Sequence, residues 1–152
     1  SQYNTLIVNR EGFTKKQNET ADDIERLLES DINRQEQEDI FVRLKENKAL
    51  HILVQAISSA KDTDSKVKLI AAVWESGMDA ADEFLFFVRL ACSNDFLIAH
   101  EALTVIENTE SKIDIPKLES AMQIALSSKG ANTDLQKSLM DSIKSIAKNS
   151  ES

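Results

Sequence analysis

Apolar residues recur along most of the chain at intervals of three and four residues. This spacing places them on one face of an α-helix and is the main signal of an amphipathic helix. The segments between them are short and polar, and the chain holds only three Gly and one Pro. We therefore predict an all-α protein with about seven or eight helices, which lie as follows: from Thr20 onward, 36–47, 49–60, up to Gly77, from Asp79 to Ala91, 96–108, from Pro116 onward, and from Thr133 to Ile146.

Threonines and acidic residues mark the expected starts of the first and last helices. Thr20 is expected to cap the first helix, because Asp22 and Asp23 then lie in a first turn where the helix dipole favours negative charge. Thr133 and Gln136 have the spacing of a capping box at the start of the last helix. In the helix at 96–108, Leu97 is expected to face inward.

The segment around residues 84–91 is apolar on nearly every side. A helix of this kind is usually buried, so we expect it to be the central helix of the fold. Phe84, Phe86, Phe87 and Trp74 are therefore interpreted as core residues. The alternative is that Phe84 or Phe87 forms a hydrophobic groove or a subunit interface with Trp74.

Three segments of the chain repeat one another: 53–59, 88–93 and 122–128. Each ends a helix on a small polar residue and is followed by a loop and a second amphipathic helix. The marker residues Ser58, Cys92 and Ser127 are 34 and 35 residues apart. A single amphipathic pair cannot bury its own apolar face, so neighbouring pairs are expected to stack.

The chain resembles the HEAT/armadillo-like α-helical repeat superfamily in three features: the length of its repeat, the pairing of its helices and the small residues at helix ends. The resemblance covers 48–147 or the whole of 20–147. It implies a right-handed stack of antiparallel helix pairs, an α-α superhelix, whose curved surface binds proteins or peptides. A plain right-handed helical bundle would also fit the pattern.

The chain is expected to hold one helical-repeat domain, at 20–147, between two terminal segments. Residues 1–19 read as an N-terminal arm or tail, in which Tyr3, Leu6, Ile7 and Val8 form a small apolar cluster, and a short strand is the alternative. Residues 148–152 read as a frayed C-terminal tail, since termini are poorly ordered unless they are docked.

Net charge narrows the classes of partner. The chain carries −8 and has a pI of about 4.8. Without a cluster of Lys and Arg, neither nucleic acid nor an anionic membrane surface is an expected partner. Residues 18–39 carry nine acids against Arg26 and Arg34, which we interpret as a solvated outer face. The alternative is a docking surface for a basic partner.

Residues able to perform chemistry are few, and we expect neither an enzyme nor a bound cofactor or metal. His51 and His100 lie far apart in the sequence, and neither has the neighbouring ligands that a zinc site requires. The single cysteine, Cys92, cannot form an internal disulfide, which fits a reducing compartment such as the cytoplasm. It is interpreted as a small buried residue; the enzyme alternative would use it with His100 and Glu101.

The function that fits these observations is a non-catalytic protein–protein interaction module, a helical-repeat scaffold or adaptor for a protein or peptide partner. The alternative is a structural or regulatory homo-oligomer, a helical bundle that pairs through its aromatic helix. The residues expected to contact a partner lie on the second helices of the pairs and around the aromatic helix: Lys66, Trp74, Phe84, Phe87, His100, Glu101, Thr104 and Glu107.

Charge reversal at Glu101 together with Glu107 tests this surface. We expect the double variant to bind a partner more weakly while its far-ultraviolet circular dichroism stays unchanged, since both positions lie on the polar side of their helix. Unchanged partner binding by a folded double variant would exclude this surface.

Overall fold

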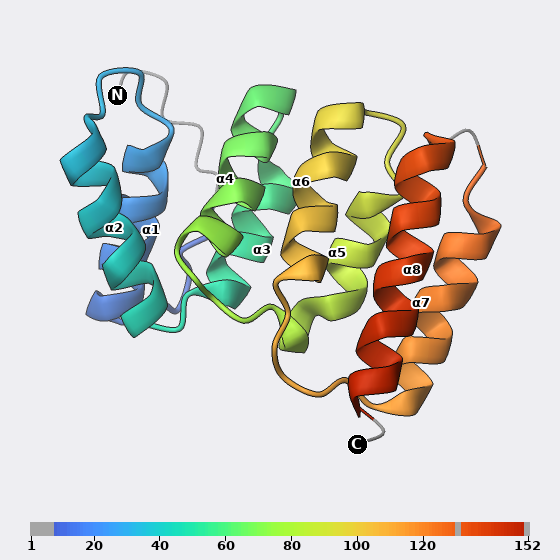
Figure 1. Ribbon diagram of the computed structural model, residues 1–152. Helices are drawn as coiled ribbons and strands as arrows, with labels where there is room; N and C mark the ends of the chain where they lie inside the picture. The colour runs from blue at the N-terminus through green and yellow to red at the C-terminus, as the bar shows by residue number, and fades with distance from the viewer. Residues whose placement is uncertain (1–7, 130–131, 151–152) are drawn as a thin grey trace. The chain divides into compact units, whose positions relative to one another are not determined.

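The computed structural model describes residues 8–129 and 132–150, and this part of the chain is helical without a β-strand (Figure 1). The all-α prediction is confirmed. Eight α-helices and one short 3-10 helix, η1, follow one another along the described residues: α1 (Lys15–Leu27), α2 (Arg34–Glu46), α3 (Leu50–Ser59), α4 (Thr63–Glu75), η1 (Ala81–Glu83), α5 (Phe84–Ala91), α6 (Phe96–Glu107), α7 (Ile115–Ser127) and α8 (Thr133–Ser150).

The chain divides into two compact units, Ser1–Met78 and Asp79–Ser152. In the first unit α1 packs against α2, α3 and α4, and α3 packs against α4. In the second unit α5 packs against α6, α7 and α8, while α8 also packs against α6 and α7. Each unit therefore consists of two helix pairs, and the predicted pairing of consecutive helices is confirmed.

The core of the first unit is built from aliphatic side chains. Ile24 of α1, Leu53 and Ile57 of α3, and Ile70 of α4 are fully buried. The helix α2 is different, since Ile40 and Leu44 are its only buried residues. Apolar burial therefore holds α2 less firmly than the other helices of this unit.

The core of the second unit contains aromatic as well as aliphatic side chains. Phe84 and Phe87 on α5 are 1% and 0% exposed, and the ring of Phe87 lies edge-on to that of Phe86, with centroids 5.2 Å apart. Leu139 and Ile143 of α8 are buried as well. As expected from its composition, α5 lies in the core, although Phe86 remains partly exposed.

The end of α4 matches its sequence signal. Gly77 has a φ of +77°, in the left-handed region that glycine adopts readily. Its amide donates to the Trp74 carbonyl at 3.1 Å, and the Met78 amide donates to the Val73 carbonyl at 3.1 Å. These two bonds form a Schellman motif, which satisfies carbonyls that the end of the helix would leave unpaired.

Two predicted helix caps are wrong. Thr14, not Thr20, caps α1, and it forms a capping box with Gln17. Thr20 lies inside the helix and is 2% exposed. The first turn of α1 holds only polar residues, so apolar periodicity could not reveal it. At α8 the carboxamide oxygen of Asn132 accepts from the amides of Asp134 and Leu135, at 3.1 and 3.3 Å.

Other expectations at these ends have mixed outcomes. The Gln136 side chain does not complete a box with Thr133, because its Nε2 donates to the Ala125 carbonyl at the end of α7, at 2.7 Å. The helix α8 continues to Ser150, beyond the expected start of the tail. Tyr3, Leu6 and Ile7 lie outside the described residues.

Two leucines on the apolar side of their helices are exposed. Leu97 of α6 is 54% exposed, so its predicted inward orientation is wrong. Leu126 of α7 is 59% exposed.

None of the described helices combines the length and the apolarity that crossing a bilayer requires.

Replacing Phe87 by Ala tests the aromatic core. We expect the free energy of unfolding to fall by about 3–5 kcal/mol, because truncating a buried Phe loses apolar contacts and leaves a cavity. Urea unfolding followed by far-ultraviolet circular dichroism measures the change. Leu126→Ala, at an exposed site, is the matched control and should stay within about 0.5 kcal/mol of the native chain. Equal losses in the two variants would contradict the placement of Phe87.

Candidate functional site

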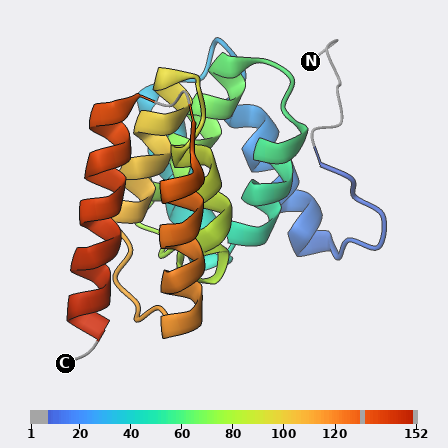
Figure 2. The ribbon, with the colours of Figure 1, turned by 90° about the vertical axis from the view of Figure 1, so that its right-hand side faces the viewer.

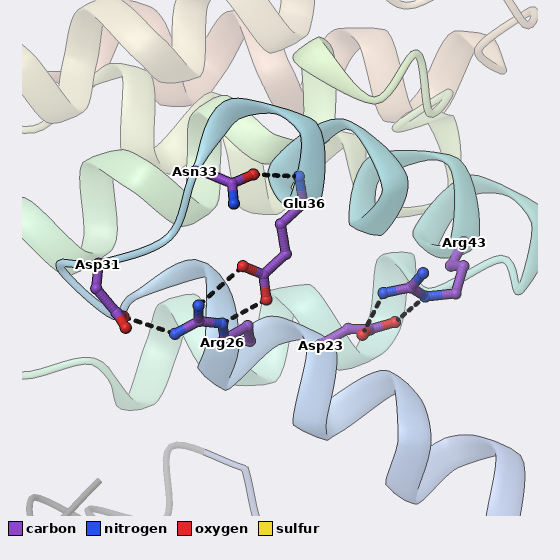
Figure 3. Close-up of polar contacts among 6 residues, drawn as sticks. All are labelled: Asp23, Arg26, Asp31, Asn33, Glu36 and Arg43. Carbon is purple, nitrogen blue, oxygen red and sulfur yellow. Dashed lines mark hydrogen bonds and ion pairs between the residues drawn. The ribbon is translucent and has the colours of Figure 1, made fainter.

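The acidic segment at 18–39 forms ion pairs within the chain. Arg26 of α1 donates two hydrogen bonds to the Glu36 carboxylate on α2, at 2.6 and 2.8 Å, and a third to Asp31 at 2.7 Å (Figure 3). Arg43 near the end of α2 donates two bonds to Asp23 on α1, at 2.9 and 3.0 Å. Two forked arginine contacts therefore join α1 to α2, one near each end of α2.

A third arginine holds the segment before α1. The Arg10 guanidinium donates to Asp22 at 2.7 Å and to Glu25 at 2.6 Å, and both acids lie on α1. Arg34 forms a weaker pair with Glu38, at 3.3 Å. At least six of the nine acids therefore have an arginine partner inside the chain: Asp22, Asp23, Glu25, Asp31, Glu36 and Glu38. Four arginines balance only part of the nine negative charges, so a dock for a basic partner stays a prediction.

The arginine contacts change the protonation of the acids they hold. Hydrogen bonds from Arg26 lower the pKa of both the Asp31 and the Glu36 carboxyl below the ordinary range. The pairs face solvent, so each contributes little to stability by itself. The forked geometry fixes orientation, because the planar guanidinium matches the two oxygens of one carboxylate.

An apolar groove lies between α7 and α8 in the second unit. It has a volume of about 570 Å³. Figure 2 shows the two helices, orange and red, running side by side. The side chains that line it are mostly apolar, with charged groups at the edges: Lys112, Ile113, Asp114, Ile115, Leu118, Glu119, Met122, Ile143, Lys144, Ala147 and Ser150.

The sequence of α7 explains why this groove is open. Leu118, Ala121 and Ala125 form the buried face of the helix. Ile115, Met122 and Leu126 lie on a second face, at intervals of seven and four residues, so they share one stripe along the helix. The ends of this stripe, Ile115 and Leu126, are 62% and 59% exposed. The helix therefore has more apolar surface than the rest of the unit covers.

The start of α7 fixes the position of the stripe. The Asp114 carboxylate accepts from the Lys117 amide at 2.9 Å and so caps the helix, and Pro116 occupies its first turn. Both are favoured at these positions, because a carboxylate satisfies an unpaired amide and proline lacks one. Ile115 is thereby held at the mouth of the groove.

Four of the expected partner-binding residues lie together on α6. His100 and Glu107 are exposed, while Glu101 and Thr104 are half-buried. The His100 ring lies edge-on to Phe96, with centroids 5.8 Å apart, and Phe96 is 52% exposed. Phe96 shares this surface and is not among the residues predicted from the sequence to contact a partner.

The other four expected residues lie elsewhere. Lys66 and Trp74 belong to α4 in the first unit, where the Lys66 ammonium donates to the Ile57 carbonyl at 2.8 Å. Phe84 and Phe87 belong to the core of the second unit. Their burial favours the core interpretation over a groove or an interface, since these side chains offer a partner no surface.

Cys92 lies beside a shallow polar hollow at the ends of α5 and α7. The hollow is also lined by Arg89, Ser128 and Lys129. Burial raises the pKa of the Cys92 thiol, although a hydrogen bond with Ser128 opposes that shift. Arg89 lies in the last turn of α5, where the helix dipole favours a cation, and Lys129 follows the C-cap of α7. Among the described residues, no group of three or more His, Cys, Asp or Glu side chains is placed to hold a metal ion.

Comparisons with known proteins leave the family open. No protein-family model, no curated protein and no solved structure matches the chain significantly. The helix pairs are compatible with a helical-repeat fold, while membership of the HEAT/armadillo superfamily stays a prediction.

Replacing Arg26 by Met tests the contact between α1 and α2. Because the pKa values of Asp31 and Glu36 are lowered in the folded chain, their pairing stabilises it above the ordinary carboxyl range of about 4 and is lost as the pH falls through the lowered values. We expect the variant to be less stable at neutral pH and the difference to shrink below about pH 4.

Fluorescence of Trp74, the only tryptophan, reports urea unfolding of this unit at each pH. Arg34→Met removes the exposed pair with Glu38 and serves as the control, with a smaller expected effect. A difference between native and Arg26→Met chains that does not change with pH would exclude these carboxylates as its source.

Proposed function

We propose that this chain is a non-catalytic protein-interaction module and that the groove between α7 and α8 is its docking surface. The observation that carries the proposal is the apolar stripe of Ile115, Met122 and Leu126, which runs from the groove onto open surface. Contiguous exposed apolar side chains with a polar rim are typical of protein-binding sites.

The composition of the groove favours a protein over a small molecule. Pockets for small ligands usually place several polar groups inside an apolar cavity, where they fix the orientation of the ligand. Here the interior is formed by Leu118, Met122 and Ile143, and the charged side chains stand at the edge. Two neighbouring helices with this arrangement can receive a third helix along its apolar face.

The chemistry of Cys92 supports the non-catalytic part of the proposal. A thiol nucleophile reacts as the thiolate, which a lowered pKa favours. Burial raises the pKa of Cys92 instead. The ring of His100, the base in the enzyme alternative, contacts Phe96.

A second contact surface on α6 stays a prediction. Phe96 and Leu97 are 52% and 54% exposed, and they lie on the same helix as His100 and Glu101. A partner could therefore be bound through α6 and not through the groove. The two surfaces lie on different helices, so separate variants distinguish them.

Affinity capture from lysate with matched variants tests the groove. The native chain, Ile115→Glu, Val42→Glu and the Glu101→Lys/Glu107→Lys double variant serve as bait, and the recovered proteins are quantified by mass spectrometry. Val42 is the control, because it is also an exposed aliphatic residue, at 57% against 62% for Ile115, but lies on α2. We expect Ile115→Glu alone to lose the partner that the native chain captures, since a buried carboxylate opposes apolar docking.

Each other pattern of loss contradicts the assignment. Loss only in the Glu101→Lys/Glu107→Lys double variant would move the docking surface to α6. Loss in both Ile115→Glu and Val42→Glu would point to a general effect of added charge. Capture by all four chains alike would exclude the groove.

A further inference from the structure

We propose that the partner which fits the groove between α7 and α8 is a second copy of this chain, in a two-fold symmetric dimer. This inference rests on the proposed function, because it names the occupant of the same groove. A two-fold interface brings one surface against itself, so the surface must be complementary to its own image. The groove meets this requirement in both its charges and its apolar residues.

The charges at the edge of the groove balance one another. Lys112 and Lys144 contribute two positive charges, and Asp114 and Glu119 contribute two negative charges. The chain as a whole carries −8. A groove for a strongly basic or acidic partner would be expected to carry an excess of the opposite charge, whereas a balanced rim is complementary to itself.

The charges are also on suitable helices. Glu119 lies on α7 and Lys144 on α8, and both line the groove. In a dimer whose two-fold axis runs parallel to the helices, α7 of one copy lies against α8 of the other copy. Glu119 of each copy then faces Lys144 of its partner, so the dimer contains this pair twice.

The heights of the two residues along the helices agree. The start of α7 and the end of α8 lie at the same end of the groove, since Ile115 and Ser150 both line it. At a rise of 1.5 Å per residue, Glu119 is about 6 Å and Lys144 about 9 Å from that end. Side chains of this length span the remaining difference.

The apolar stripe completes the interface. Under the same rotation, Ile115 and Met122 of one copy face the groove side of α8 in the other, around Ala147. The small side chain of Ala147 leaves room for a larger one to enter. Apolar residues then lie at the centre and the charged pairs at the rim, as in specific protein interfaces.

Charge exchange tests the dimer directly. The mass of the purified chain is measured by sedimentation over a range of concentrations for Glu119→Lys, Lys144→Glu, their equimolar mixture and the double variant. We expect each single variant to raise the dissociation constant on the order of 10-fold, because both pairs become like-charged. The mixture should restore the dimer as a heterodimer, and the double variant should restore it alone, since opposite charges face each other again.

Two further variants serve as controls. Lys61→Glu makes the same change at an exposed position of the first unit that does not line the groove, and should leave the dissociation constant unchanged. Ile115→Glu should give a monomer with native circular dichroism, because the side chain is already exposed in the single chain.

The other outcomes overturn the proposal and separate it from the proposed function. A native chain that stays monomeric, or a dimer that the charge exchanges or Ile115→Glu do not affect, excludes this symmetric contact. If the chain is monomeric and Ile115→Glu still loses a captured protein, the groove binds a different partner and the proposed function stands. If the chain is monomeric and capture is unaffected, both proposals fail.

Discussion

Each unit depends on a helix that contacts the other three. An amphipathic pair leaves its apolar face uncovered, and a shared helix is what lets two pairs cover one another. The helix α1 has this position in the first unit, and in the second unit both α5 and α8 have it. The helices α1 and α5 cover the apolar faces of their neighbours in different ways. The eight residues of α5 bring Phe84 and Phe87 into the core, whereas α1 combines Ile24 and Leu27 with arginine contacts along its side.

The two units also differ in the surface that they leave exposed. In the first unit Arg10, Arg26 and Arg43 pair with five acids on and around α1, so these carboxylates are already engaged within the chain. In the second unit the aromatic core supports α7 without covering its outer stripe. The apolar side chains left there, above all Ile115, make this unit the stronger candidate for recognition.

The sequence predicted the elements of the fold better than their surroundings. Helical period and Gly77 identify most helices and one end, because these signals act within a few residues of the chain. Periodicity does not show whether an apolar side chain is covered by another helix. It therefore predicts that Leu97 faces inward, and it gives no sign of the groove beside α7. The pairs of Arg10 and Arg43 are not predictable for a related reason, because both arginines lie outside the acidic segment at 18–39 whose carboxylates they contact.

The attachment of α2 has a consequence for motion within the first unit. Only Ile40 and Leu44 anchor this helix in the core, and its two ends are held by Arg26 and Arg43. Local opening of α2 therefore exposes little apolar area and separates charges that salt screens. The backbone amides of α2 can exchange hydrogen through an opening whose free energy falls with ionic strength. In α5 the side chains of Phe84, Phe87 and Val88 are buried in the core, so we expect its amides to exchange only when the second unit unfolds.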